Sequence, residues 1–353
     1  MKKEILHVCG LGPIIPPYVD FLEESFDLGN HYFWVYGDHD RYPLNKENNV
    51  YKVKNGYINR LEGCLVFIKN VSSAEKVILH GLFDTRIILM LWMMPWVAYK
   101  CYWIMWGGDL YSHKNGKKNW KVRVRNFFSR QVIKKIGHLV TYVPGDIKRA
   151  QKWCAARGEY HECLMYLSNV VSLEKIKAVE RISESHSGLH ILVGNSADPS
   201  NNHVESFKKI LPYRDKDIRI YVPLSYGDQE HAKKVMSLGY EWFGDRFYPL
   251  TSFMEYDDYF KFLKNIDIAI FNHERQQAMG NTITLLALGK TVYMRSDVSQ
   301  WDLFSSKGIK ILNIADFDSS TLDSTRLARN KEIVIENFSR KKLIEQYSKL
   351  LRK

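Results

Sequence analysis

The chain shows one pattern twice: short segments rich in β-branched and aromatic residues alternate with segments whose apolar residues have helical spacing. Such alternation predicts parallel sheets covered by helices on both faces, which is an α/β fold. The predicted strands lie at residues 5–9, 32–36, 77–80, 102–105 and 138–142, and then at 190–193, 218–222, 246–248, 268–271, 291–294 and 309–312. The predicted helices lie at residues 84–94, 119–136, 202–211, 229–238, 255–265, 282–288 and 300–306.

A polar, irregular segment at residues 167–188 separates the two halves of the chain. A chain of 353 residues is long enough for two domains of about 150 residues each. We therefore predict one Rossmann-like domain at residues 1–175, a second at residues 186–335, and a basic helix at residues 336–353. Two doubly wound domains of this kind would face a cleft, and ligands would bind outside the carboxyl ends of their strands.

A long stretch of the first half carries only positive charge. The net charge of the chain is +12, and no Asp or Glu occurs at residues 110–145. Basic segments of this kind bind phosphates, either of nucleic acid or of anionic lipid, although a solvated helix face is the alternative without function. The candidate membrane-contacting residues are Lys117, Lys118, Lys121, Arg123 and Arg125.

The apolar run at residues 87–99 precedes this basic stretch, is rich in Trp and Met, and contains Pro95. It is shorter than the roughly 20 residues that span a bilayer. A basic amphipathic helix with aromatic anchors beside it favours an anionic membrane surface. Because no signature of a nucleic-acid-binding fold is present, we expect a membrane partner and no nucleic acid.

The five cysteines are scattered, and no pair has Cys-x-x-Cys spacing. This usage argues against a structural zinc site and fits a reducing cytoplasm. The first residues contain two lysines but no apolar core long enough for a signal peptide. We therefore expect a cytoplasmic protein.

Two loops of the second half combine small residues, polar side chains and a helix start. Gly194, Asn195 and Ser196 follow one predicted strand, and the segment Glu274, Arg275, Gln276, Gln277, Gly280, Asn281 and Thr282 follows another. Small residues and helix N-termini allow a phosphate to approach the backbone. Arg275 could neutralise a diphosphate through bidentate hydrogen bonds. For the first loop, a simple helix cap is the alternative.

Two strand ends of the first half carry candidate catalytic groups. Asp109 follows two glycines in the segment Trp106-Gly-Gly-Asp-Leu-Tyr111, and His80 precedes Gly81 at the end of another predicted strand. A carboxylate in this position could act as the general base that deprotonates an acceptor hydroxyl. The alternatives are a helix cap for Asp109 and a structural role for His80.

Several enzyme classes lack their residues in this chain. There is no Walker loop, no complete Gly-x-Gly-x-x-Gly after the first strand, no Gly-x-Ser-x-Gly and no His-Glu-x-x-His. Asp-x-Asp, which can hold a divalent metal on a nucleotide sugar, occurs three times, and only Asp38-His39-Asp40 closely follows a predicted strand. A metal-independent transferase must instead stabilise its leaving diphosphate with cations and helix dipoles, and the loop around Arg275 offers both.

The loops together resemble a known family. The segments Trp106-Gly-Gly-Asp-Leu-Tyr111, Ile191-Leu-Val-Gly-Asn-Ser196 with Ser200-Asn-x-His203, Val222-Pro-Leu-x-Tyr226 and Arg275-Gln-Gln-x-x-Gly280 are similar to those of glycosyltransferase family 56, the bacterial TDP-Fuc4NAc:lipid II Fuc4NAc transferases. The resemblance runs in order from about residue 77 to residue 304. Glu274 and the segment Ser225-Tyr226-Gly227 depart from the family pattern, and a different donor sugar would account for Glu274.

The resemblance implies a GT-B fold, with acceptor binding in the first domain and nucleotide-sugar binding in the second. It places Asn195, Arg275, Gln276, Gln277 and Gly280 on the donor side, and His80 and Asp109 on the acceptor side. It also implies a peripheral protein on the cytoplasmic face of a bacterial inner membrane, with a polyprenyl-diphosphate-linked acceptor. A GT-B fold lowers the expectation of a metal at Asp-x-Asp.

The resulting hypothesis is transfer of an acetamido-dideoxy hexose from a dTDP- or UDP-linked donor to a lipid-linked acceptor, with no cofactor and no metal. Asp109 would be the base and His80 would assist it, while Tyr226, Tyr248 and Leu250 would border the nucleoside. The alternative is a non-catalytic GT-B-like protein that binds a membrane or nucleic acid.

Overall fold

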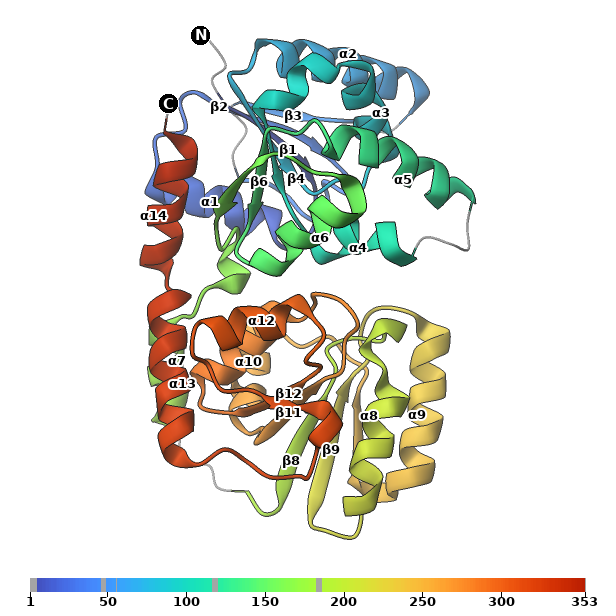
Figure 1. The fold of residues 1–353 in the computed structure, drawn as a ribbon, viewed down its shortest axis with the longest axis vertical. Coiled ribbons are helices and arrows are strands. Elements are labelled where there is room, and N and C mark those ends of the chain that lie inside the picture. The colour runs from blue at the N-terminus through green and yellow to red at the C-terminus, as the bar shows by residue number, and fades with distance from the viewer. Residues whose placement is uncertain (1–4, 46–48, 55, 116–119, 182–185, 353) are drawn as a thin grey trace. The chain divides into compact units, whose positions relative to one another are not determined.

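The structure is a computed structural model that describes residues 5–45, 49–54, 56–115, 120–181 and 186–352. The chain divides into two compact units, one of Met1–Ser168 with Leu343–Lys353 and the other of Asn169–Lys342 (Figure 1). The last helix therefore belongs mainly to the first unit, although it follows the second unit in sequence. Each unit is an α/β domain with an all-parallel sheet.

The sheet of the first unit has seven strands in the order β3-β2-β1-β4-β5-β6-β7. The strands are β1 (Ile5–Gly10), β2 (His31–Tyr36), β3 (Val50–Lys52), β4 (Lys76–His80), β5 (Cys101–Ile104), β6 (His138–Thr141) and β7 (Glu159–Glu162). The order reverses between β1 and β4. Their carboxyl ends thus form the switch point at which doubly wound sheets bind ligands.

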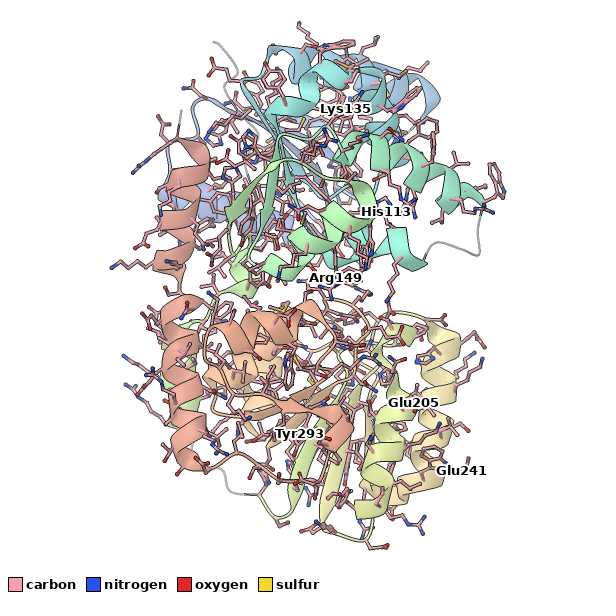
Figure 2. The ribbon with its side chains drawn as sticks, viewed as in Figure 1. His113, Lys135, Arg149, Glu205, Glu241 and Tyr293 are labelled. Carbon is pink, nitrogen blue, oxygen red and sulfur yellow. The ribbon has the colours of Figure 1, made fainter. Side chains whose placement is uncertain are left out.

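The first unit also contains α1 (Ile15–Ser25), α2 (Tyr57–Ser73), α3 (Thr85–Met93), η1 (Pro95–Lys100), α4 (Gly107–Asn115), α5 (Trp120–Ile133), α6 (Pro144–Cys154) and α14 (Arg340–Leu351). Asp84 caps α3 by accepting from the Arg86 N–H, and Pro95 divides the apolar run into α3 and the short helix η1. Arg149 of α6, labelled in Figure 2, lies over the Tyr111 ring of α4 at 5.7 Å.

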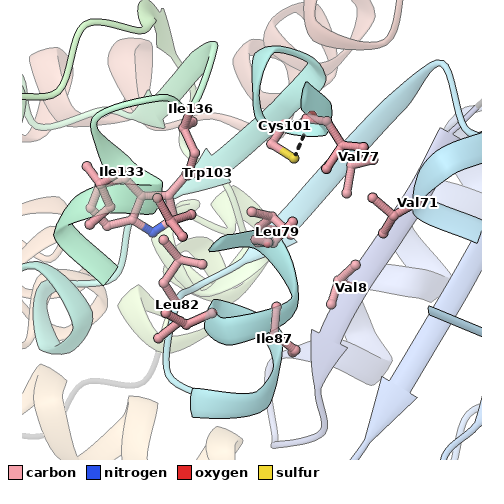
Figure 3. Close-up of a cluster of buried hydrophobic side chains, with 14 of the residues drawn as sticks. Val8, Val71, Val77, Leu79, Leu82, Ile87, Cys101, Trp103, Ile133 and Ile136 are labelled. Atoms are coloured by element: carbon pink, nitrogen blue, oxygen red, sulfur yellow. Dashed lines mark hydrogen bonds between the residues drawn. The ribbon is translucent and has the colours of Figure 1, made fainter. Parts of the chain in front are cut away.

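One face of this sheet buries a continuous apolar cluster under α2, α3 and α5 (Figure 3). Leu79 of β4 and Trp103 of β5 pack there with Ile87 of α3 and Ile133 of α5. Burial of each such side chain contributes roughly 1.5–3 kcal/mol. On the other face, Tyr18 of α1 packs on Tyr347 of α14, so the end of the chain helps to close the first unit.

The sheet of the second unit has six strands in the order β10-β9-β8-β11-β12-β13. The strands are β8 (Leu189–Val193), β9 (Ile218–Pro223), β10 (Phe247–Leu250), β11 (Ile268–Phe271), β12 (Thr291–Met294) and β13 (Leu312–Asn313). The α-helices are α7 (Leu173–Glu180), α8 (His203–Ile210), α9 (Gln229–Phe243), α10 (Tyr256–Lys264), α11 (Met279–Ala287), α12 (Ser299–Ser306) and α13 (Ser324–Asn337). The switch point lies between β8 and β11.

The predicted alternation and its α/β class are confirmed, but some boundaries were wrong. The strand predicted at residues 309–312 is reduced to β13, because both backbone groups of Lys310 bond to the Asn330 side chain at 2.7 Å instead of to a neighbouring strand. The helix predicted to begin at Thr282 begins at Met279. Gly280 and Asn281 therefore lie inside its first turn.

Candidate functional site

The loops after β8 and β11 lie next to each other at the switch point of the second unit. Gly194 ends β8 with a φ of +70°, and a Cβ at this position would lie 2.8 Å from Asn201 Oδ1. The same oxygen accepts from the Asn195 N–H at 3.0 Å and lies 2.7 Å from His273 Nε2 of the second loop. Only glycine allows this close approach without strain, so Gly194 fixes how the two loops meet.

A chain of polar side chains joins three strand-end loops. Asn195 donates from Nδ2 to the Tyr226 hydroxyl at 3.0 Å, and its Oδ1 accepts from Gln277 Nε2 at 3.0 Å. Ser200 in turn donates to Gln277 Oε1 at 2.8 Å. Because β8, β9 and β11 are neighbours in the sheet, residues far apart in sequence meet here, and the donor-side predictions Asn195, Tyr226 and Gln277 lie in one network.

Arg275 contributes the cation of this region. Its Nη2 lies 3.2 Å from Asp198 Oδ2, and its side chain is 22% exposed. Burial acts to raise the pKa of Asp198, but hydrogen bonds from Ser200 and the charge of Arg275 outweigh it and lower that pKa. The ion pair therefore holds the guanidinium at the junction of the two loops.

Helix α11 begins directly after this junction. Ala278 caps it with a φ of +55°, and the Gln277 N–H and C=O both contact the side-chain amide of Gln300. These contacts fix the direction in which the free N–H groups of the first helical turn point. Of the other predicted residues here, Glu274 is exposed, Gln276 and Gly280 are half-buried, and the Asn281 amide donates to the Tyr259 hydroxyl at 3.0 Å.

A pocket of about 280 Å³ lies beside this network. The fold brings four of the predicted donor-binding residues to its lining: Asn195, Tyr226, Leu250 and Asn281. Pro223 and Ser225, at the end of β9 and in the loop after it, also line the pocket. Sequence reasoning missed the lining residues from the segment after β10 and from α10: Ser252, Phe253, Met254, Glu255 and Tyr259. The sequence signal that could have indicated them is the pair of aromatic residues Phe253 and Tyr259, which lies between two predicted strands.

The other predicted donor-binding residues do not line this pocket, and three of them have structural contacts instead. Ser196 is buried, and its hydroxyl accepts from Asn201 at 3.3 Å. Thr282 is also buried, and its hydroxyl donates to the Ala278 carbonyl at 2.9 Å. Tyr248 stacks on Tyr221 with ring centroids 5.2 Å apart. In this structure these residues support the loops and the sheet.

Two buried histidines flank the Gly194 turn. His203 Nδ1 lies 3.1 Å from His231 Nε2, and His273 contacts Asn201 as described. Burial lowers the pKa of both His203 and His273 to about 3. Both rings are therefore neutral at pH 7, and they orient the turn without adding charge to it.

In the first unit, Asp109 lies in the first turn of α4 and is only 2% exposed. Its Oδ2 accepts from the Leu82 N–H at 3.0 Å and from Trp103 Nε1 at 2.8 Å. Its Oδ1 accepts from the N–H groups of Trp106 at 3.0 Å and Leu110 at 2.8 Å. The carboxylate thus ties the loop after β4 to the loop after β5. To act as a base, the Asp109 carboxylate would have to break some of these hydrogen bonds. Its role as the base stays a prediction.

Burial raises the pKa of Asp109 to about 7, against the opposing effect of its hydrogen-bond donors. We expect Asp109→Asn to lower the free energy of unfolding by about 2 kcal/mol, because the amide NH₂ would face N–H donors that lose their acceptor. Urea denaturation at pH 8 measures this loss. Trp103→Phe, which removes one donor and keeps the charge, is the comparison variant. An Asp109→Asn protein of unchanged stability that has lost turnover would instead identify a base.

His80 lies in a buried chain of rings that crosses the sheet of the first unit. His31 Nδ1 is 3.0 Å from His7 Nε2, and His7 Nδ1 is 3.2 Å from His80 Nε2. His80 Nδ1 then lies 2.8 Å from the Tyr166 hydroxyl, which accepts from Trp106 Nε1 at 3.1 Å. Sequence reasoning missed His7 and Tyr166, because nothing local links residues so far apart.

Neutral histidines can pass hydrogen bonds along this chain of rings. Trp106 donates to the Tyr166 hydroxyl, and the donor at each contact beyond it depends on the tautomers of His80, His7 and His31. Burial lowers the pKa of His80 to about 3, so the ring is neutral at pH 7. His80 therefore connects the Trp106 loop to the interior of the sheet, and its predicted role in assisting catalysis stays a prediction.

The Asp-x-Asp segment that most closely follows a strand forms an exposed turn after β2. Asp38 Oδ1 accepts from the N–H groups of Asp40 at 3.2 Å and Arg41 at 2.9 Å. His39 Nε2 lies 3.3 Å from the Val53 carbonyl. As the turn is arranged here, the Asp38 carboxylate caps the backbone.

The helices α3 and α5 with η1 expose large apolar side chains beside basic ones. The aromatic and aliphatic members are Trp92, Met93, Trp96, Tyr99, Trp120, Val124 and Phe127, of which Trp96 is 64% and Trp120 69% exposed. Lys121 and Arg123 are exposed on α5, and Arg125 is half-buried and contacts Asn126. Lys135, labelled in Figure 2, follows α5 and is exposed. Lys117 and Lys118 lie outside the described residues.

This group of side chains, here called the aromatic-basic surface, is formed by packed neighbours rather than by one helix. The Trp92 ring of α3 meets the Phe128 ring of α5 with centroids 4.9 Å apart. Within the residues that the structure describes, no helix is both long and apolar enough to cross a bilayer.

Comparison with known families gives one match along most of the chain. The model of the 4-alpha-L-fucosyltransferase family, glycosyl transferase group 56, matches residues 48–347. This family is the one that the loop motifs resembled. The match favours a transferase over the non-catalytic alternative.

Solved structures similar to this chain share its two-domain fold at low sequence identity. Anabaena HepE in complex with UDP and glucose has a TM-score of 0.68 at 10% identity, covering 99% of this chain and 99% of that chain. Sucrose-phosphate synthase from Thermosynechococcus elongatus has a TM-score of 0.66 at 11% identity, covering 98% of each chain. The UDP-GlcNAc 2-epimerase from Methanocaldococcus jannaschii has a TM-score of 0.52 at 13% identity and 99% coverage of each chain. The GT-B fold is therefore shown, and since an epimerase shares the two-domain fold, the family match determines the enzyme class.

Proposed function

This chain belongs to the glycosyl transferase group 56 family and is a nucleotide-sugar glycosyltransferase, and we propose that it moves an acetamido-dideoxy hexose from a dTDP- or UDP-linked donor to a lipid-linked saccharide. The observation that carries the donor side is the network of Asn195, Tyr226 and Gln277 around the pocket at the switch point of the second unit. Ligands of doubly wound sheets bind at this place.

The lining of the pocket supports a nucleoside as the occupant. Tyr226, Phe253 and Tyr259 offer ring faces, the two tyrosines also offer hydroxyl groups, and Glu255 and Asn195 offer polar atoms. A planar base stacks on aromatic rings, while a ribose needs hydrogen-bond partners. The diphosphate would then extend toward Arg275 and the free N–H groups at the start of α11. The exposed Glu274 carboxylate next to Arg275 would contact the sugar and select its substituents.

The reaction would proceed by attack of an acceptor hydroxyl oxygen on the anomeric carbon of the donor sugar. The bond between this carbon and the phosphate oxygen breaks, the nucleoside diphosphate leaves, and the hydroxyl proton passes to a base. Arg275 and the N-terminus of α11 would stabilise the charge on the leaving diphosphate, which is the work that a divalent metal does in other transferases. In this proposal no metal and no cofactor takes part.

Calorimetric titration of the full chain with TDP, UDP and GDP tests the donor assignment. We expect saturable binding of TDP or UDP, and about tenfold weaker binding by Tyr226→Ala, because loss of one stacking ring costs roughly 1–3 kcal/mol. Tyr240→Ala, which removes an exposed ring of α9 outside the pocket, is the matched control. Absence of binding for all three nucleotides would overturn the assignment.

We further propose that the aromatic-basic surface binds the anionic membrane that carries the acceptor, on the cytoplasmic face of a bacterial inner membrane. Exposed Trp and Phe rings partition into the headgroup region, and nearby Lys and Arg side chains add about 1 kcal/mol each on an anionic surface. Trp120 and Phe127 are exposed on α5, which also carries Lys121 and Arg123, and Trp96 is exposed on η1. This combination is the support for a peripheral protein.

Cosedimentation with phosphatidylglycerol vesicles tests the membrane proposal. The double variant Trp96→Ala/Trp120→Ala should bind at least tenfold more weakly, because it removes two interfacial anchors. Lys121→Gln/Arg123→Gln should weaken binding at low salt and have little effect at high salt. Tyr240→Ala serves again as the control. Equal binding by all variants, or equal binding to uncharged vesicles, would contradict the proposal.

A further inference from the structure

Three potential metal ligands converge on the edge of the sheet of the first unit. His138 begins β6, and Glu159 and His161 lie on the edge strand β7. The register pairs His138 with Glu159 and Val140 with His161. In a parallel pair, these partners and residues two positions along project from the same face, so all three side chains share one face of the sheet.

The separations of their ligand atoms fit one metal ion. His138 Nδ1 is 2.9 Å from His161 Nε2, and Glu159 Oε2 lies 3.6 Å from the first nitrogen and 3.8 Å from the second. A tetrahedral Zn²⁺ with bonds of about 2.0–2.2 Å places its ligand atoms roughly 3.3–3.5 Å apart. Shifts of a few tenths of an ångström would therefore bring all three atoms to one ion.

The surroundings hold the two imidazoles in this arrangement. The His138 ring stacks on Tyr102 with centroids 3.9 Å apart and an angle of 9° between the planes. The Lys76 ammonium lies over the Tyr102 ring, 5.3 Å from its centroid, and donates to the Leu350 carbonyl at 2.9 Å. Both histidine side chains are only about a quarter exposed, at 22% and 24%, whereas the Glu159 side chain is 69% exposed and would become ordered on binding.

We propose that His138, Glu159 and His161 form a site for a divalent transition-metal ion such as Zn²⁺, with the remaining coordination position open to water. Imidazole and carboxylate ligands suit this class of ion. Among the residues that the structure describes, this is the one group of three such side chains close enough to share an ion. The site uses no cysteine, which is why cysteine spacing gave no sign of it.

The place of the site indicates a structural role. His138 and Glu159 begin their strands, whereas His80 ends β4, so the group lies at the amino end of the parallel sheet and the candidate acceptor loops at the carboxyl end. An ion here would fasten the edge strand β7 to β6. The inference is therefore independent of the proposed sugar transfer.

Titration of the full chain with Zn²⁺, after removal of metal with EDTA, tests this site. The parent for all variants carries Cys64→Ser, because Cys64 is the half-buried thiol of the chain and could bind zinc adventitiously. We expect one equivalent of bound Zn²⁺ and a rise of about 3–5 °C in the thermal midpoint. Co²⁺ in place of Zn²⁺ should give the intense visible bands of a four-coordinate ion.

The variants distinguish this site from incidental histidine binding. His161→Gln should weaken Zn²⁺ binding at least thirtyfold and Glu159→Gln about tenfold, each with loss of the Co²⁺ bands. His186→Gln is the matched control, because His186 stacks on His190 and lies beside Asp267 in the second unit, but within the described part of the chain these three side chains are not a group close enough to share an ion. Unchanged affinity in His161→Gln, an equal loss in His186→Gln, or no saturable binding by the parent would overturn the site. Nucleotide binding should be unchanged in every variant.

Discussion

Replacing Arg275 with alanine is expected to lower kcat/KM for sugar transfer by two to three orders of magnitude while the protein stays folded. Removal of one preorganised group that stabilises transition-state charge costs about 10²–10³ in rate. Arg275 is the cation held at the junction of the two switch-point loops, next to the start of α11. The loss should appear in kcat as well as KM, since the charge on the leaving diphosphate grows as the glycosidic bond breaks.

Two further variants separate a contact with the diphosphate from a merely structural ion pair. Asp198→Asn breaks the 3.2 Å pair but leaves the guanidinium in place, so it should change kcat/KM by less than about fivefold if Arg275 acts on the ligand. Arg326→Ala removes an exposed arginine of α13 that pairs with Asp323, and it should have no effect. If Asp198→Asn matched the loss in Arg275→Ala, the ion pair rather than the cation would be responsible.

The free energy of unfolding is expected to fall by about 4 kcal/mol between pH 7.5 and pH 5.5. Burial lowers the pKa of His80, His203 and His273 to about 3, and that of His7 well below its usual value. An unfolded histidine takes up a proton near pH 6.5, whereas these folded histidines do so only at a much lower pH. Their contribution to stability is thus complete above pH 6.5 and is lost as the pH falls from 6.5 toward 3.

Asp109 acts in the opposite sense. Its pKa is raised to about 7, so between pH 4 and pH 7 the folded protein keeps a proton that the unfolded chain has lost. The contribution of Asp109 to the free energy of unfolding is therefore complete below pH 4 and is lost as the pH rises through 7. One such group offsets only part of the effect of the buried histidines, each worth on the order of 1 kcal/mol at pH 5.5. The net slope should therefore follow the histidines.

Urea denaturation at pH 7.5, 6.5 and 5.5 measures this slope in each variant. His273→Asn should be less stable at pH 7.5, because it loses its contact with Asn201, but its stability should fall less with acid than that of the wild type. His186→Gln, which changes a histidine that is one-quarter exposed, should keep the wild-type slope. A slope that is the same in His273→Asn and in the wild type would rule out this histidine as a contributor.

The sequence alone was enough to predict the α/β class, most strand positions and the polar loops that follow the strand ends, because each depends on local patterns. A buried parallel strand is a short apolar run, and functional side chains follow its carboxyl end, as Asn195, Tyr226 and Gln277 do. Where a prediction failed, a distant side chain had intervened. Asn330 takes both backbone hydrogen bonds of Lys310 and so shortens the last strand.

Asp109 shows what the sequence determined and what the tertiary structure decided. The segment Trp106-Gly-Gly-Asp placed a carboxylate at the end of a strand, and this much is local. That both of its oxygens are filled by N–H groups from Leu82, Trp103, Trp106 and Leu110 depends on the pairing of β4 with β5. Strand register likewise brings distant residues to one face of the sheet in two other places: the chain of rings through His7 and His80, and the group of His138, Glu159 and His161. No local sequence pattern encodes the register between strands that are joined by long crossovers.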